Sequence, residues 1–336
     1  MACVVASQDL RAPVVFLFET LAVAACYYAA GRLGLLCGLT VGGAVVSPIW
    51  PPTGVAVACL LVLGLRCWAG IALGALAVLM HLTSPGPSVL GVLAGNTAAP
   101  VVGYLLLRKV GFRTDLIRLR DCLALVFLGA FAAMLISSST GVGLLVATGD
   151  LPGQDLWVVW LAWWVGDAMG VLLVTPLLLV LRQVRAPLRW PRWKEAMGLV
   201  VVAGGLVPLA TRSPASVLFS VYPLLIWAAL RFQLAGSMAC SLFASVMATV
   251  AATDHVGPFV HLSDVQVMIN LQAFNGAMAL TALLLSAVIA EQRNTRRSVE
   301  RACQELVEVL EHLTAGEPGA GRPQRDEGGR RRNADG

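Results

Sequence analysis

Charged residues are scarce in this chain of 336 residues, of which Asp, Glu, Lys and Arg together make up 13%. A soluble globular domain carries about 25%, so the 58% hydrophobic content instead predicts several membrane-spanning segments. The net charge of +5 gives no reason to expect nucleic acid as a partner, because the basic residues lie in short connections and in the C-terminal tail. We expect a multi-pass protein of the cell (plasma) membrane, with the lipid bilayer as its surroundings.

Catalytic motifs are missing as well. The eight cysteines include no Cys-x-x-Cys pair, so no disulfide or metal framework of that kind is expected. The sequence has no GxxxxGK[ST] or GxGxxG loop for a nucleotide phosphate and no Ser/His/Asp constellation. We therefore expect no cofactor and no enzymatic activity. The N-terminus lacks a basic stretch followed by a small-residue cleavage site, so the first apolar run is expected to stay as a span.

Apolar runs predict an all-α polytopic membrane protein, a bundle of about 8–10 transmembrane helices. The ten runs are residues 13–30, 52–65, 67–80, 88–107, 121–147, 157–181, 196–210, 215–230, 233–252 and 269–290. The second and third runs are each near 21 Å long as helices, whereas a bilayer core is about 30 Å thick. The second and third runs are therefore two thin spans, two half-helices or one broken span, and the same holds for the eighth and ninth runs. The number of membrane-spanning helices is then between eight and ten.

The charges of the connections predict the orientation of the bundle. Residues 108–120 and 182–194 are rich in Lys and Arg, whereas residues 148–156 and 253–268 contain neither. By the positive-inside rule the first two connections are cytoplasmic and the other two are outside. Both termini are then cytoplasmic. Arg212 falls on the outer side and counts against this scheme.

The chain becomes polar after residue 290. A seam of apolar residues at alternating spacings of four and three predicts a short coiled coil, which would allow a homodimer. The seam is Val299, Cys303, Leu306, Leu310 and Leu313. The last residues contain no side chains able to build a core and are expected to be disordered. The expected parts are a cytoplasmic N-terminus, a multi-span domain, the coil or signalling helix and the tail: residues 1–12, 13–293, 294–314 and 315–336.

Asp167 is a carboxylate about 15 Å inside the run 157–181. A charge at such a depth costs about 2.5–3.5 kcal/mol on insertion scales. Asn96 and Glu19 are further polar residues inside apolar runs. These residues either hold helices together by hydrogen bonds or take part in ligand or proton sensing. We expect Asp167 and Asn96 to meet near the middle of the membrane.

A proline-rich motif precedes the second run. It is either a plain helix start or the ligand-facing end of a half-helix with exposed N–H groups. Its residues are Trp50, Pro51, Pro52, Thr53 and Gly54. Pairs of glycines four residues apart predict close helix packing. These pairs are Gly70 with Gly74, Gly91 with Gly95, and Gly166 with Gly170.

The predicted outer connection 253–268 contains Asp254, His255, His261 and Asp264. These side chains are of the types that bind metals, but their spacing matches no familiar site, so we expect no metal and keep these residues as the alternative. The histidines would also respond to external pH. Asn270, Gln272 and Asn275 begin the last run, which leads directly into the coil and is the natural route for a signal to leave the membrane.

Several short motifs occur in a fixed order from residue 13 to about residue 293, and together they resemble the first-described bacterial membrane-associated sensor (MASE-type) domain. The motifs are Trp50–Gly54, Gly64-Leu65-Arg66 with Trp68 and Gly70, Gly95-Asn96-Thr97, Trp164–Gly170 with Thr175-Pro176, Tyr222-Pro223-Leu224 with Trp227, Arg231-Phe232, Gly257-Pro258-Phe259 and Ala290–Arg293.

This resemblance implies an integral membrane sensory domain of the kind that is followed in its chain by a histidine kinase, a diguanylate cyclase or a related output. It implies no catalytic residues, and it adds weight to Trp50–Gly54, Asn96 and Asp167 as sensing positions. No output domain follows in this sequence. We therefore expect a stand-alone sensor with a separate kinase or cyclase partner, or a sensor whose output was lost or truncated.

Two functions remain open at this point. A sensor would couple an unknown stimulus to a cytoplasmic output through the last span and the coil. The uninterrupted run from the last span into the coil favours this function. The alternative is a small-molecule or ion transporter, since broken helices and carboxylates inside the membrane also suit passage of a substrate.

Overall fold

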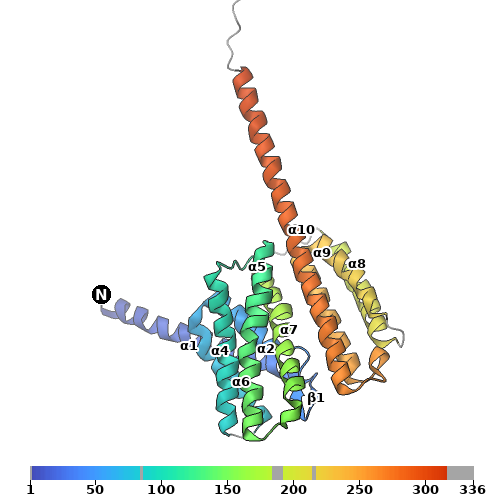
Figure 1. The fold of residues 1–336 in the computed structure, drawn as a ribbon. Coiled ribbons are helices and arrows are strands. Elements are labelled where there is room, and N and C mark those ends of the chain that lie inside the picture. The colour runs from blue at the N-terminus through green and yellow to red at the C-terminus, as the bar shows by residue number, and fades with distance from the viewer. Residues whose placement is uncertain (1, 84–85, 184–191, 214–216, 316–336) are drawn as a thin grey trace, which may run out of the picture. The chain divides into compact units, whose positions relative to one another are not determined.

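The computed structural model describes residues 2–83, 86–183, 192–213 and 217–315, and it confirms the all-α polytopic fold (Figure 1). Within these residues, eight helices are long and apolar enough to cross a membrane. The helices are α1 (Ala2–Leu35), α2 (Pro51–Leu63), α3 (Trp68–Leu82), α4 (Pro87–Lys109), α5 (Leu119–Ala124), α6 (Ala133–Thr148), α7 (Leu156–Gln183), α8 (Trp193–Arg212), α9 (Val221–Thr253) and α10 (Asp264–Ala315). A π-helix, Leu125–Ala132, joins α5 to α6.

The chain divides into two compact units, Met1–Glu291 and Gln292–Gly336. In the second unit the seam residues Val299, Leu306 and Leu310 are more than half exposed, and the coil itself stays a prediction. The predicted disordered tail lies outside the described residues except for Ala315, and so do residues 184–191 of the predicted basic connection.

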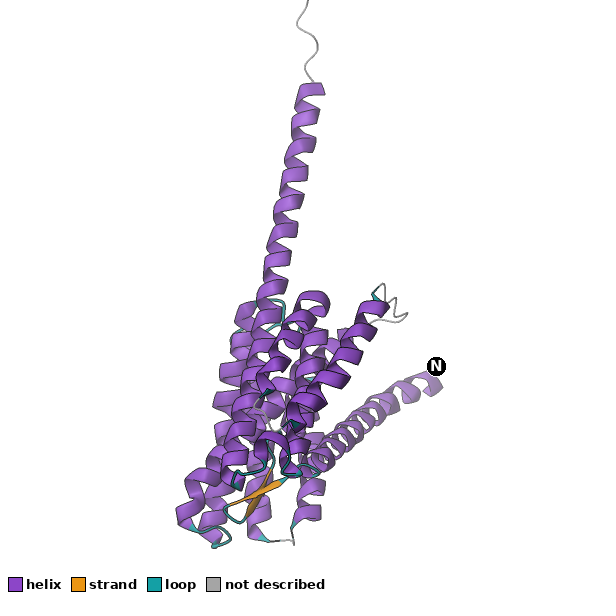
Figure 2. Cartoon of the chain, turned by 90° about the vertical axis from the view of Figure 1, so that its right-hand side faces the viewer, coloured by secondary structure: helices purple, strands orange, loops and turns teal. Residues whose placement is uncertain are grey.

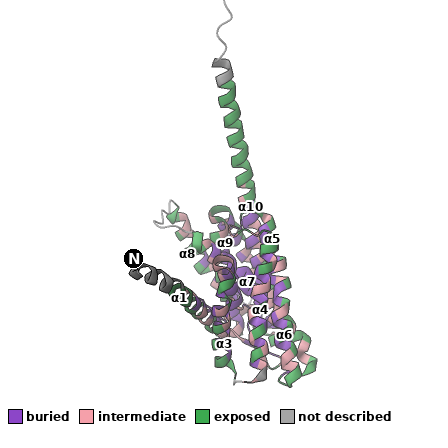
Figure 3. Cartoon of the chain, turned by 90° about the vertical axis from the view of Figure 1, so that its left-hand side faces the viewer, coloured by how far each residue is buried: buried purple, intermediate pink, exposed green. Residues whose placement is uncertain are grey.

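Helix α7 is the centre of the first unit. Its spanning window is 61% buried, whereas no other span exceeds 50% within the described residues. Figure 3 shows buried ribbon around α7 and a largely exposed α8. A helix that is apolar on all sides is expected to be surrounded by protein or lipid, and here other helices surround it.

A β-hairpin that the sequence analysis missed joins α1 to α2. Strands β1 (Leu39–Val41) and β2 (Ala44–Val46) are antiparallel, and Figure 2 shows them at one end of the bundle. Gly42 and Gly43 form the turn with φ of 56° and 82°, a conformation that glycine adopts without strain. A Cβ on Gly42 would lie 2.8 Å from the Cβ of Asp155, so the hairpin packs on the connection before α7.

Helix α9 consists of two helices that meet at a reversal. Gln233 has φ 56° and ψ −144°, which no α-helix accommodates. Arg231, before the reversal, pairs with Glu195 at the start of α8. Gly257, beyond the end of α9, lies against the backbone of Thr211 at the end of α8. The chain after Gln233 therefore returns along the length of α8, and the first half of α9 is only about 18 Å long.

The same arrangement occurs near the N-terminus. Helix α2 has 13 residues with proline in its first turn, and Arg66 just after it pairs with Glu19 of α1 at 3.0 Å. The first half of α9 carries Pro223 in its first turn and also ends at an ion-paired arginine. Each pair of short runs predicted from the sequence is thus a short helix followed by a longer one, which is why ten runs give eight helices of spanning length in the described part of the chain.

Candidate functional site

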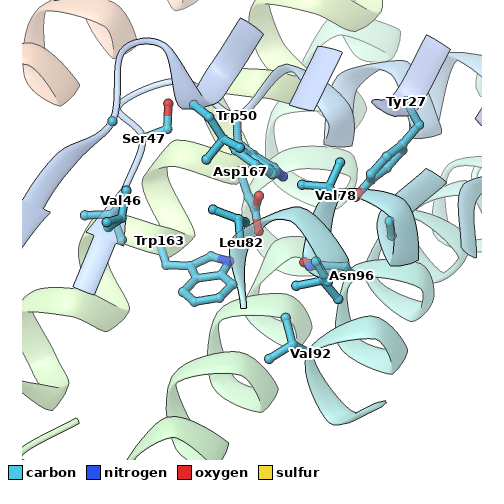
Figure 4. Close-up of a pocket in the computed structure, with 15 residues that line it drawn as sticks. Tyr27, Val46, Ser47, Trp50, Val78, Leu82, Val92, Asn96, Trp163 and Asp167 are labelled. Carbon is cyan, nitrogen blue, oxygen red and sulfur yellow. The ribbon is translucent and has the colours of Figure 1, made fainter. Parts of the chain in front are cut away.

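A cavity of about 90 Å³ lies within the bundle, between α1, the segment after β2, α3, α4 and α7. Most of its wall is aliphatic. The polar or aromatic side chains in the wall are Tyr27, Ser47, Trp50, Asn96, Trp163 and Asp167. Figure 4 shows the Asp167 carboxylate between the side chains of Trp50, Trp163 and Asn96. The fold therefore brings together three of the sensing candidates that are far apart in the sequence.

Asp167 is 1% exposed and is the charged side chain of this wall. Ser137 and Trp163 lie near its carboxylate, but neither oxygen has a hydrogen-bond partner among the described residues. The Ser137 hydroxyl donates instead to Asn96 Oδ1 at 2.8 Å. An unpartnered buried group costs about 1–3 kcal/mol, and more when it is charged. A proton, a hydrogen-bond donor or a cation bound to this carboxylate would therefore stabilise the site.

A non-helical segment brings Trp50 to this depth. The Trp50 N–H donates to Gly166 O at 2.9 Å, and the missing side chain of Gly166 makes room for the carbonyl of Ser47. The Ser47 hydroxyl lies 2.6 Å from Ile49 O and 3.0 Å from Gly34 O and shares its single proton between these two carbonyls. These bonds satisfy backbone groups that would otherwise be unpaired inside the membrane.

The rest of the motif fastens α2 to α7. The Thr53 hydroxyl lies 2.8 Å from Trp50 O and 3.0 Å from Asp167 O and shares its single proton between these two carbonyls. Gly54 faces Gly170 with no room for a Cβ on either residue. Pro51, Pro52, Thr53 and Gly54 are absent from the cavity wall, and Trp50 alone of the motif faces it. The start of α2 lies against the Asp167 backbone, so the positive end of its dipole lies on the turn that carries the acid.

The other glycine pairs also pack helices. An added Cβ would lie 2.7 Å from the Cβ of Tyr27 if placed on Gly74 and 2.6 Å from Thr20 O if placed on Gly70, so both glycines let α3 approach α1. Gly91 and Gly95 face α6. The α4–α6 contact places Asn96 beside Ser137. These packing contacts fix the positions of two walls of the cavity.

The remaining candidates lie elsewhere. The Glu19 side chain is 22% exposed and is paired with Arg66 outside the cavity. Within residues 2–83, 86–183, 192–213 and 217–315, no three His, Cys, Asp or Glu side chains form a group that could hold a metal ion. The structure therefore does not gather the four metal-binding candidates of the predicted outer connection into a cluster: Asp254, His255, His261 and Asp264.

Two wall residues were missed from the sequence. Tyr27 is 1% exposed and its hydroxyl has no hydrogen-bond partner in the described part of the chain. Trp163 is one of four tryptophans in the first half of α7, a residue type that collects at membrane surfaces, yet it faces the cavity. The neighbouring Trp164 donates to Phe131 O at 2.8 Å. Phe131 lies in the π-helix, where widened turns free carbonyls for such bonds.

Helix α7 also contacts α10. Gln272 Nε2 donates to Ala162 O at 2.7 Å, one residue before Trp163. A Cβ on Gly276 would lie 3.8 Å from Met169 Cε, two residues after Asp167. Gln272, one of the polar residues at the start of the last run, therefore contacts the helix that carries the acid.

Comparison with known proteins gives one family. No curated protein and no solved structure matches the chain. The model of the MASE1 family matches residues 20–293, a range that contains the cavity, α7 and the bundle part of α10. This confirms the resemblance drawn from the ordered motifs. The chain is a multi-pass membrane protein and belongs to the MASE1 family of membrane-associated sensory domains found in signalling proteins.

Proposed function

We propose that the Asp167 cavity is the sensory site and that α7 passes its state to α10. The observation that carries this proposal is the double contact of α7. One part of its surface presents Asp167 and Trp163 to the cavity, and another holds Gln272 of α10 by a hydrogen bond to Ala162 O. A change in the charge or occupancy of the cavity would shift α7, and α10 would follow through this bond.

A row of buried serines on α9, of which Ser237 contacts α10, supports movement of α10. The hydroxyls of Ser241 and Ser245 and the side chain of Asn275 have no partner within the described residues, while Ser237 and Ser286 hydrogen-bond at 2.6 Å. Hydroxyls four residues apart repeat at about one helical turn. A shift of α10 by one turn would therefore exchange one set of polar partners for an equivalent set, as bistable elements require.

The output belongs to the same proposal. Helix α10 continues without interruption to Ala315, so a displacement within the membrane reaches the predicted coil. We propose that the coil pairs two copies of the chain, that a kinase or cyclase partner reads its state, and that the chain itself catalyses no reaction.

Hydrogen–deuterium exchange on the full chain in lipid nanodiscs tests this route. Asp167→Asn, which removes the charge and keeps the shape, is expected to change exchange along residues 264–291. Asp121→Asn is the matched control, because Asp121 is also buried (4% exposed) but lies outside the cavity wall. Equal exchange along α10 in the native chain and the Asp167 variant would refute the coupling.

A transporter is the second candidate, and the repeated short helices favour it. Transporters often consist of internal repeats with broken helices near a central binding site, and α2 with α3 and the two halves of α9 share that form. Substrate flux in reconstituted vesicles that depends on Asp167 would support transport and contradict a purely sensory role.

A further inference from the structure

The wall of the cavity contains the Asp167 carboxylate, and most of the other side chains in the wall are aromatic or aliphatic. No Lys, Arg or His is among its wall residues, and both Asp167 oxygens lack a hydrogen-bond partner among the described residues. Tyr27, Trp50 and Trp163 supply three aromatic rings to the same wall. Aromatic faces attract cations, most strongly where water is excluded. A carboxylate combined with three aromatic rings is the chemistry of a site for a positively charged organic group.

The size of the cavity limits the ligand. An apolar cavity of about 150 Å³ holds a benzene molecule with its six carbon atoms. In proportion, the 90 Å³ cavity here holds about four non-hydrogen atoms. The aliphatic wall, which includes Val46, Val78, Leu79 and Val92, would contact a short alkyl group. An ammonium with several N–H groups would donate to both Asp167 oxygens at once.

A bare metal ion fits this wall poorly. Hard cations such as Ca²⁺ take six to eight oxygen ligands, and the Asp167 carboxylate supplies only two. Asn96 Oδ1 already accepts a hydrogen bond from Ser137. Most of the remaining wall consists of carbon atoms, so the wall offers too few ligands to offset the free-energy cost of removing water from a metal ion.

Two residues of the cavity wall reach the surface at the end of the bundle that carries the β-hairpin. Val45 in β2 is 60% exposed and Leu82 at the end of α3 is 47% exposed, and both are also wall residues. The hairpin packs on the connection around Asp155, which the loop charges assign to the outside. A ligand would therefore enter from the outer side of the membrane.

We propose that the cavity binds a small monovalent alkylammonium ion of about four non-hydrogen atoms, held by the Asp167 carboxylate and by the rings of Tyr27, Trp50 and Trp163. This inference rests on the proposed sensory role of the same cavity and names the class of its ligand. Binding would supply the cation and the hydrogen-bond donors that Asp167 lacks, so occupancy would neutralise the charge of the cavity beside α7.

Isopropylammonium and isopropanol form the decisive pair of probes, because they have the same shape and differ in charge. Each is titrated into the full chain in lipid nanodiscs while tryptophan fluorescence and calorimetric heat are recorded, with KCl as the inorganic control. We expect saturable binding of isopropylammonium and none of the other two. Asp167→Asn should weaken binding by about 30-fold or more, as expected when a buried charge loses its partner. Trp163→Leu should weaken it by about tenfold, and Asp121→Asn should leave it unchanged.

Each other result overturns the proposal. Equal binding of isopropanol would mean that the carboxyl is neutral, and equal binding of potassium would mean a site for bare cations. Absence of binding to the folded native chain would also refute it. If Asp167→Asn fails to fold, Trp163→Leu and the comparison of the three probes on the native chain still decide the matter.

The same experiments distinguish failure of the proposed sensory coupling from failure of the proposed ligand class. Isopropylammonium binding without any change of exchange along α10 would remove the proposed coupling and keep the ligand class. A change of α10 in Asp167→Asn without alkylammonium binding would remove the ligand class and keep the coupling.

Discussion

Gly170 is the position where an added methyl group should do most damage to the site. A Cβ there would overlap Trp50 O and would lie 2.5 Å from Thr53 Oγ1. The carbonyl of Trp50 is backbone and cannot rotate away, so Gly170→Ala must push α2 from α7. Overpacking of this kind costs about 1–3 kcal/mol.

The displacement has a second cost. The single hydroxyl proton of Thr53 is shared between Trp50 O and Asp167 O, and loss of this hydrogen bonding removes about 1 kcal/mol. Alanine recovers about 1 kcal/mol through its better helix propensity. The free energy of unfolding should therefore fall by about 1–3 kcal/mol.

Equilibrium unfolding by sodium dodecyl sulfate in mixed micelles, followed by circular dichroism, measures this difference. Gly205→Ala in α8 is the matched control, since nothing lies within 4 Å of the added Cβ, and it should be neutral or stabilise by up to about 1 kcal/mol. Equal effects of the two variants would refute the close contact between α2 and α7.

Three further outcomes are expected from other contacts. Ser137→Ala should lower the free energy of unfolding by about 1–3 kcal/mol in the same assay, because Asn96 loses its buried donor; an unchanged value would mean that this bond contributes little. Trp164→Phe should cost about 0.5–1.5 kcal/mol through loss of the bond to Phe131 O in the π-helix, and native stability would contradict that role. Mild oxidation of membranes should link two copies through the exposed Cys303 if the coil is a homodimer, and Cys303→Ser should abolish that species; a native chain that stays monomeric would argue against the pairing.

The spans were predictable because the bilayer imposes long apolar runs whatever the tertiary packing. The deep position of Asp167 followed from the same runs, and the structure places it and Asn96 on one cavity. The course of the chain between spans was not predictable in the same way. The Gly42-Gly43 turn between short apolar strands was a readable hairpin signal. The interruption after residue 230 predicted a break between the eighth and ninth runs, but not that the chain reverses its direction at Gln233.

The aromatic wall depends on tertiary contacts. Tyr27 is one apolar-run residue among many, and only the approach of α3, permitted by Gly74, defines where its ring lies. Trp163 shares its run with three other tryptophans that fit a membrane surface equally well, so sequence spacing cannot tell which one turns inward. Such choices are decided by how neighbouring helices pack.

The central claim is that Asp167 and α10 are coupled through α7, and a double variant tests it most directly. Gln272→Leu removes the hydrogen bond to Ala162 O and leaves the cavity wall intact. We predict that Asp167→Asn changes hydrogen exchange along residues 264–291 in the native background and has no such effect in the Gln272→Leu background. An equal change in both backgrounds would contradict the account.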